Sequence, residues 1–159
     1  MAAPVERAPD GCDLVRVCES ALSHDEAVGF VTEDDCGAVA TFLGVTRNNF
    51  QGKRVVTLSY EAYTPMAESE MRKICVAARS RFGVKKCCIL HRIGEVAVGQ
   101  SSVIIAAGSP HRADALKAVA WAIDELKTTV PIWKKEIYAE GDATWKQNRE
   151  WDPRALGQS

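Results

Sequence analysis

Strand-like and helix-like segments alternate along this chain, and their order restricts it to a mixed α/β class. Runs rich in apolar and β-branched residues predict strands at 14–18, 37–44, 54–60, 84–91, 101–107 and 132–138. Apolar residues at helical spacing, together with capping signals, predict helices at 23–31, 65–82 and 110–129. We therefore expect either an α/β or an α+β arrangement.

The length of 159 residues favours one domain, because domains commonly hold roughly 100–200 residues. We expect a single folded domain at 13–151, a flexible leader at 1–12 and a flexible tail at 152–159. Hydrophobic residues make up 47% of the chain and charged residues 26%, a balance that excludes extensive disorder.

Charge and hydropathy exclude several classes of protein. The net charge of −1 argues against binding to nucleic acid or to an anionic membrane through bulk charge. The longest apolar runs, 103–107 and 118–123, are far shorter than the roughly 20 residues of a membrane span. The first residues lack the apolar core of a secretory signal. We therefore expect a cytosolic protein that binds neither membrane nor nucleic acid.

Six cysteines and three histidines show no spacing typical of a zinc site. We expect reduced, packed thiols, and Cys87 and Cys88 should point to opposite faces of one strand. The chain also lacks the phosphate-binding glycine loop, the dinucleotide-binding fingerprint, the nucleophile elbow and the H-E-x-x-H zinc motif. These features predict neither a bound metal nor a cofactor.

The helix expected at 110–129 carries a lysine among its apolar residues. Five side chains should form its buried stripe: Leu116, Val119, Ala120, Ile123 and Leu126. At about 100° per residue, Lys127 falls within that stripe. Burial there would lower the pKa of its amine, which could then act as a base or a nucleophile. The alternative is a solvated lysine that interacts favourably with the helix dipole.

The start of the same helix carries two cations. Ser109 is the expected N-cap and Pro110 the first helical residue, so His111 and Arg112 lie in the first turn. The helix dipole disfavours positive charge at this end, and a bound phosphate or carboxylate would remove the conflict. The alternative is a solvated arginine beside a partly packed histidine.

Further cations lie near this helix in sequence or follow earlier strands. Lys134 and Glu136 share one face of the last expected strand, shortly after Lys127. If the two ammonium groups converge, each lowers the pKa of the other. Lysines that protect a strand edge would instead explain Lys134 and Lys135 without any chemistry. Arg47, in the polar loop after the second expected strand, is a third candidate cation for the same anion.

Five short motifs occur in order between about Cys36 and Trp151. They are Gly44-Val-Thr-Arg47, Ser59-Tyr-Glu-Ala-Tyr63 with Pro65-Met66, His91-Arg-Ile-Gly94, Ser109-Pro-His-Arg112 and Leu126-Lys-Thr-Thr-Val-Pro-Ile-Trp-Lys-Lys-Glu136. Taken together, they resemble the family of large, catalytic subunits of molybdopterin synthase. We assign no catalytic role to the turn at 91–94.

The resemblance implies an α/β hammerhead fold with an additional antiparallel β subdomain. It also implies a dimer of this chain flanked by two small ubiquitin-like subunits, each with a Gly-Gly C-terminus that carries sulfur as a thiocarboxylate. Two such sulfurs convert cyclic pyranopterin monophosphate into the dithiolene of molybdopterin. The cysteines of this chain then need no role in the transfer, because the sulfur arrives on the partner.

Matching the motifs residue by residue implies a catalytic role for Lys127 and Lys134. The residues implied to bind or surround the substrate are Arg47, His111, Arg112, Lys135, Glu136 and Arg149. Of these, Arg47 and the His111-Arg112 pair would anchor the phosphate. Our hypothesis is that Lys127 transfers protons during sulfur transfer and that Lys134 supports it electrostatically or as a second acid or base.

Two other functions fit the same residues. The chain could be a non-catalytic docking partner of a ubiquitin-like protein, in which case lysine substitutions would change no rate. It could also be a hydrolase of small phosphorylated metabolites that uses the same cations and turns over without a sulfur-carrying partner.

Overall fold

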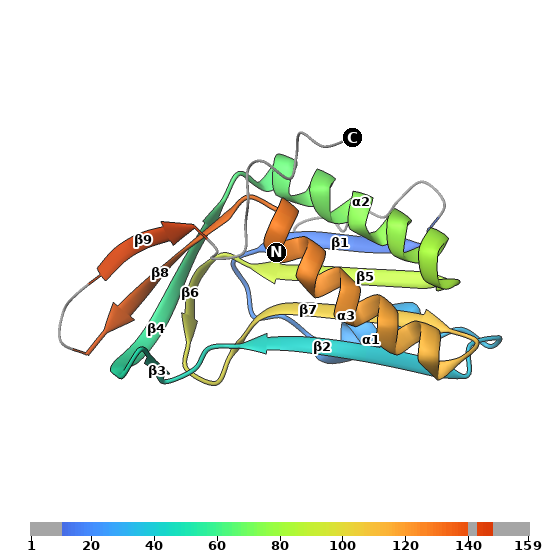
Figure 1. Ribbon diagram of the computed structural model, residues 1–159, viewed down its shortest axis with the longest axis horizontal. Coiled ribbons are helices and arrows are strands. Elements are labelled where there is room, and N and C mark those ends of the chain that lie inside the picture. The colour runs from blue at the N-terminus through green and yellow to red at the C-terminus, as the bar shows by residue number, and fades with distance from the viewer. Residues whose placement is uncertain (1–10, 140–142, 148–159) are drawn as a thin grey trace.

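The computed structural model describes residues 11–139 and 143–147, which form three α-helices and nine β-strands in two sheets (Figure 1). The strands are β1 (Asp13–Cys18), β2 (Ala38–Val45), β3 (Asn49–Phe50), β4 (Lys53–Ala62), β5 (Lys86–Arg92), β6 (Gly94–Ala97), β7 (Ser101–Ser109), β8 (Ile132–Tyr138) and β9 (Ala143–Gln147). The helices are α1 (His24–Val31), α2 (Thr64–Phe82) and α3 (Arg112–Thr129). The expected tail, Arg149 and all but the last two residues of the expected leader lie outside the described residues.

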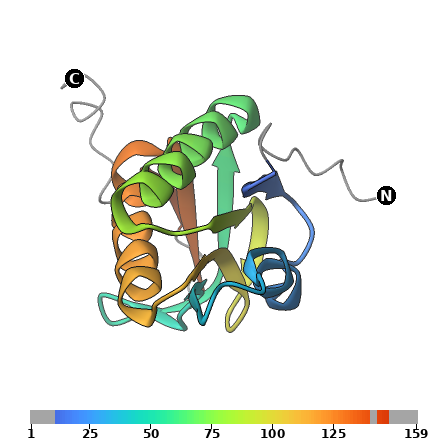
Figure 2. The ribbon, with the colours of Figure 1, turned by 90° about the vertical axis from the view of Figure 1, so that its right-hand side faces the viewer.

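The first sheet has the strand order β1-β5-β7-β2. β1 runs parallel to β5, whereas β7 is antiparallel to both β5 and β2. Helices α2 and α3 cover one face and α1 covers the other (Figure 2). Side chains alternate between two cores, so Cys87 packs on the α2 and α3 side while Cys88 packs on the α1 side. This confirms the prediction that the two thiols face opposite ways.

Helix α1 begins as its sequence predicts and lies close to the sheet. The Ser23 hydroxyl accepts a hydrogen bond from the Glu26 backbone N–H at 3.1 Å. The Glu26 carboxylate pairs with the Arg16 guanidinium at 2.6 and 2.8 Å instead of closing a capping box. Gly108 allows the close approach of α1, because a Cβ built there would lie 2.0 Å from the carbonyl oxygen of Val31.

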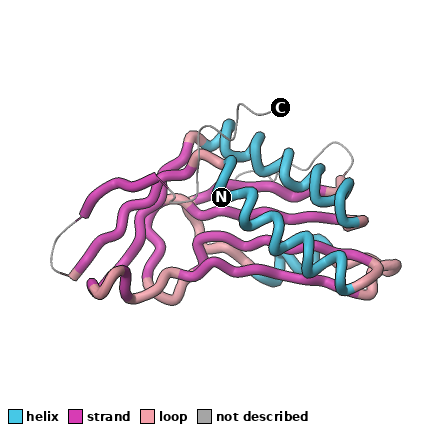
Figure 3. Tube along the Cα trace, viewed as in Figure 1, coloured by secondary structure: helices cyan, strands magenta, loops and turns pink. Residues whose placement is uncertain are grey.

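The second sheet is antiparallel and stands at one end of the first (Figure 3). Its path is β3-β4-β8-β9, and β6 also pairs with β4. The long strand β4 and strand β8 were expected, whereas the short strands β3, β6 and β9 were not. The mixed class and the additional antiparallel subdomain are therefore both present in the described residues.

Helix α3 buries a different face from the one we expected. The buried residues are Ala115, Ala118, Val119, Ala122, Ile123 and Leu126. Leu116 is 59% exposed and Ala120 is also exposed, so the predicted stripe was wrong by roughly 70° around the helix axis. The three buried alanines explain the error, since small side chains let α3 pack closely on α2 and the sheet. Lys127 consequently lies at the margin of the buried face.

The start of α3 also differs from the prediction. β7 continues to Ser109, and the N-cap of α3 is His111 rather than Ser109. The Ser109 hydroxyl accepts a long hydrogen bond, 3.5 Å, from the His111 backbone N–H. Arg112 is therefore the first helical residue, and no side chain caps the helix. In the described part of the chain, no helix is long and apolar enough to cross a membrane.

Candidate active site

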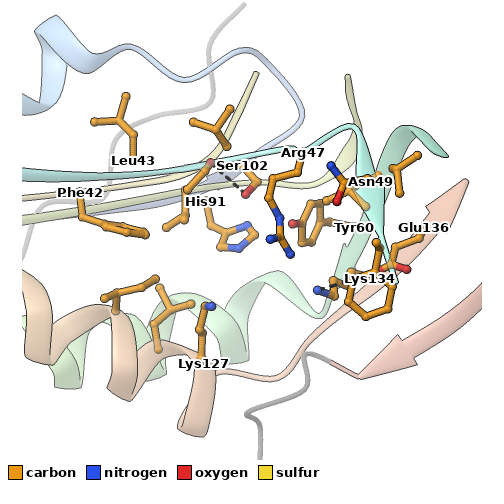
Figure 4. A pocket seen from close by; sticks show the side chains of 18 residues that line it. Phe42, Leu43, Arg47, Asn49, Tyr60, His91, Ser102, Lys127, Lys134 and Glu136 are labelled. Carbon is orange, nitrogen blue, oxygen red and sulfur yellow. Dashed lines mark hydrogen bonds and ion pairs between the residues drawn. The ribbon is translucent and has the colours of Figure 1, made fainter. Parts of the chain in front are cut away.

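A cavity of about 340 Å³ opens where the two sheets meet the C-terminal end of α3. Eighteen residues line it (Figure 4). They are Phe42, Leu43, Gly44, Val45, Arg47, Asn49, Phe50, Val55, Leu58, Tyr60, His91, Ser102, Val103, Ile123, Leu126, Lys127, Lys134 and Glu136. The cavity therefore combines an apolar wall with a small set of polar side chains, as small-molecule sites commonly do.

Three cationic side chains reach this cavity from three different elements. Arg47 follows β2, Lys127 lies in the last turn of α3, and Lys134 lies on β8 (Figure 4). The Arg47 side chain is exposed, and within the described residues no hydrogen bond or ion pair holds its guanidinium. The fold thus brings together three of the cations that sequence patterns had singled out.

Glu136 supplies the negative charge among the described lining residues. It shares a face of β8 with Lys134, as predicted, and the Lys134 Nζ lies 3.9 Å from its Oε1. The carboxylate is only 3% exposed, and the hydroxyl of Tyr138 donates a hydrogen bond to its Oε2. The buried carboxylate attracts the ammonium group of Lys134, and with three cations and one anion the described lining of the cavity has a net positive charge.

The floor of the cavity contains a buried histidine to which we had assigned no catalytic role. His91 is 3% exposed, and its Nδ1 lies 2.9 Å from the carbonyl oxygen of Arg92. Its ring packs edge-on against Tyr60 at a centroid distance of 5.3 Å. Burial lowers the pKa of His91 to about 4 and raises the pKa of Tyr60 above its ordinary value. The sequence could have indicated this burial, because His91 lies two residues after the buried Ile89, and side chains two residues apart in a strand point to the same face.

Other predicted site residues lie elsewhere in this chain. His111 and Arg112 are exposed at the opposite end of α3, about 22 Å from Lys127 at 1.5 Å per residue. Lys135 alternates with Lys134 and Glu136 on β8 and does not line the cavity. Arg149 lies outside the described residues. One chain therefore unites Arg47, Lys127, Lys134 and Glu136 but not the whole predicted set.

The chemistry of the cavity is that of an anion site with proton donors. A guanidinium and two ammonium groups suit a phosphate or a carboxylate, and lysine amines can also transfer protons. Within the described residues, no group of three His, Cys, Asp or Glu side chains is placed to hold a metal ion. None of the described cysteines lines the cavity, and no disulfide joins them.

Comparisons with known proteins agree on one family. The model of the MoaE protein family matches residues 17–129. The molybdopterin synthase catalytic subunit of Bos taurus is 51% identical over 138 residues, which cover 87% of this chain and 73% of that protein. The subunit of the same name from Arabidopsis thaliana is 45% identical over 146 residues, covering 91% of this chain and 73% of its own.

Solved structures agree as well. The crystal structure of molybdopterin synthase from Staphylococcus aureus matches with a TM-score of 0.78 at 36% identity, over 82% of this chain and 94% of that one. The MoaE protein from Burkholderia ambifaria matches with a TM-score of 0.73 at 29% identity, over 90% and 95% of the two chains.

Proposed function

The chain belongs to the MoaE protein family, and on that premise we propose that the cavity between its two sheets is the site of sulfur transfer. Family membership confirms the resemblance found in the sequence. The chain functions as the catalytic subunit of molybdopterin synthase, an enzyme of molybdenum cofactor biosynthesis. The observation that carries the proposed site is the convergence of Arg47, Lys127 and Lys134 on one cavity.

The proposed substrate is cyclic pyranopterin monophosphate, and the proposed sulfur donor is the C-terminal thiocarboxylate of a small ubiquitin-like subunit. Arg47 binds the phosphate, because a guanidinium forms charge-assisted hydrogen bonds with phosphate oxygens. The thiocarboxylate is also an anion, so the ammonium groups of Lys127 and Lys134 attract and orient it. In this proposal the three cationic side chains serve both anions.

Lys127 is the proposed acid and base of the reaction. Attack by the thiocarboxylate sulfur on a substrate carbon forms a C–S bond while the C–O bond of that carbon breaks, and the oxygen leaves after protonation. The small subunit is then joined to the substrate through an acyl–sulfur bond. Water then cleaves that bond, the small subunit leaves as a carboxylate, and the sulfur stays on the substrate. Lys127 moves the protons of these steps, while Lys134, held by Glu136, stabilises the negative charge that develops. A second small subunit supplies the second sulfur.

His111 and Arg112 enter the proposal through a second copy of this chain. Strand β2 is an edge strand of its sheet, and Val39, Leu43 and Val45 on it are 38%, 38% and 48% exposed. Its Ala38 end pairs with Ser109, next to the start of α3, and its Val45 end lies beside the cavity. An antiparallel pair of β2 strands around a two-fold axis would therefore bring the start of α3 from one copy towards the cavity of the other.

The remaining parts of the proposal concern organisation and location. We take residues 13–151 as a single catalytic domain, with Lys135 and Arg149 as neighbours of the substrate site. A cytosolic location is proposed because six cysteines without a disulfide in the described residues suit a reducing compartment.

The test combines the purified chain, thiocarboxylated small subunit and cyclic pyranopterin monophosphate, with the dithiolene product detected by mass spectrometry. Lys127→Ala should lower the rate by about 100-fold or more, the usual loss of a general acid or base. Lys117→Ala removes an exposed lysine of the same helix outside the cavity and should leave the rate unchanged.

Each outcome of this test separates the candidate functions. A Lys127→Ala chain that binds the small subunit and still forms product at the normal rate would remove the catalytic role of Lys127. Unchanged rates for Lys134→Ala as well would support the docking partner. Turnover of the substrate without the small subunit would support the hydrolase.

A further inference from the structure

The cavity contains one buried polar side chain that the proposed mechanism leaves unused. His91, near the end of β5, is 3% exposed and points into the cavity beside Tyr60 and Arg47 (Figure 4). Burying a polar group without a hydrogen-bond partner is costly, so such a group at a ligand site calls for a partner from the ligand. The protein provides a hydrogen-bond partner for Nδ1 of the imidazole, and no described protein group provides one for Nε2.

The hydrogen bond at Nδ1 determines which ring nitrogen carries the proton. The carbonyl oxygen of Arg92, 2.9 Å away, only accepts hydrogen bonds, so Nδ1 must be the donor. A neutral imidazole has one N–H, which leaves Nε2 as an acceptor whose lone pair is available to a ligand. A second proton is disfavoured, because the ring is buried and the cationic groups of Arg47, Lys127 and Lys134 line the same cavity.

The other polar side chains around the cavity are donors, are already engaged or, in the case of the Asn49 amide, are exposed rather than buried. The Tyr60 hydroxyl is hydrogen-bonded to Ser102. Arg47, Lys127 and Lys134 can only donate. Glu136 is paired with Lys134 and accepts from the Tyr138 hydroxyl. The Ser102 hydroxyl donates to the carbonyl oxygen of Gly44 at 3.3 Å. Among the described lining residues, Nε2 of His91 is therefore the buried acceptor that no described protein group occupies.

We propose that His91 is a substrate-binding residue whose Nε2 accepts a hydrogen bond from an N–H or O–H group of the pterin part of the substrate. The inference rests on the proposed function, which supplies the substrate class. The cations hold the phosphate end but cannot recognise hydrogen-bond donors, whereas a reduced pterin ring carries several N–H groups. His91 thus provides the second anchor, and two anchors fix the orientation of the substrate in the cavity.

Three substitutions separate this acceptor from the packing of the ring. His91→Gln places an amide oxygen near the position of Nε2. His91→Asn keeps a donor near the position of Nδ1 and removes the distal acceptor. His91→Phe keeps the ring against Tyr60 and removes both nitrogens. Gln and Asn differ by one methylene group, so the comparison between them does not depend on whether the Phe variant folds.

The experiment measures the dissociation constant of cyclic pyranopterin monophosphate without the small subunit, and then kcat and KM with it. Asn and Phe should raise the dissociation constant and KM by roughly 10-fold or more, because a donor on the substrate loses its partner. Gln should stay within a few-fold of the unsubstituted chain. Binding of inorganic phosphate should be unchanged in all three variants, since Arg47 is intact.

Two results would overturn the proposal. Either His91→Phe or His91→Asn binds the substrate as tightly as the unsubstituted chain, or His91→Gln is weakened as much as His91→Asn. Both results are compatible with dithiolene formation by the unsubstituted chain, so they would leave the proposed function standing. Failure of the unsubstituted chain to form dithiolene with thiocarboxylated small subunit would instead refute the proposed function.

Discussion

Mixing two impaired variants, Lys127→Ala and Arg112→Ala, should restore activity that neither shows alone. Within one chain these residues lie at opposite ends of α3, about 22 Å apart at 1.5 Å per residue. That separation exceeds the reach of an arginine side chain, so Arg112 can bind a phosphate beside Lys127 only from another copy. Arg112→Ala should then weaken substrate binding by about 1.5–3 kcal/mol, the range for a charge-assisted hydrogen bond.

The symmetry of a two-fold dimer sets the size of the recovery. Random mixing makes half of the dimers mixed, and each mixed dimer regains one of its two sites, so about a quarter of the normal activity should return. Dithiolene formation at substrate concentrations below KM measures this fraction after the differently tagged chains are refolded together. Lys127→Ala mixed with Lys134→Ala is the matched control, because both residues line the cavity of one chain and no intact site results. Absence of recovery in dimers that carry both tags would refute the shared site.

Three further predictions concern stability. Burial lowers the pKa of His91 from 6.5 to about 4, so its neutral form contributes stability that is present above pH 6.5 and lost as the pH falls towards 4. The loss amounts to about 3 kcal/mol, and urea unfolding should show that it is absent from His91→Phe. Gly108→Ala should lower the free energy of unfolding by about 2 kcal/mol or more, because the new Cβ meets a backbone carbonyl that cannot rotate away. Gly29→Ala, with open space around its Cβ, should instead be neutral or stabilising in thermal melts. Arg79→Met should cost about 3–5 kcal/mol, because Asp13 is 1% exposed and is held by two Arg79 hydrogen bonds of 2.8 Å. A loss below 1 kcal/mol in urea unfolding would contradict that account.

Local patterns were sufficient to predict most elements of the fold. Ser23 at the start of α1 and Gly83, with a φ of 68°, at the end of α2 act within a few residues of their positions in sequence. Strand β8 matches its predicted range for the same reason. Strand β6 depends on pairing with β4, which is distant in sequence, and β9 pairs with the preceding strand β8; the short sequences of both carry little signal of their own.

The site was predicted in part, and the errors have physical causes. A prediction of the buried face from hydrophobicity gives leucine more weight than alanine. The buried face of α3 nevertheless contains Ala115, Ala118 and Ala122, and Leu116 is exposed. Lys127 nevertheless reaches the cavity, because its position at the margin of that face faces the second sheet. The role proposed for His91 needs the position of the Arg92 carbonyl and the shape of the cavity, and neither is encoded in local spacing.

The edge strand β2 of the first sheet affects how a newly synthesised chain can associate with other chains. Among the described strands, β2 has a neighbour on one side only, and its other edge of backbone donors and acceptors, near the exposed Val39, Leu43 and Val45, is of the kind that can pair with a further extended peptide. Before it pairs with a second copy through β2, a newly made chain can therefore also aggregate through the same edge with extended segments of other proteins. Rapid formation of the proposed dimer would cover this edge against aggregation and would also bring Arg112 of one copy to the cavity of the other.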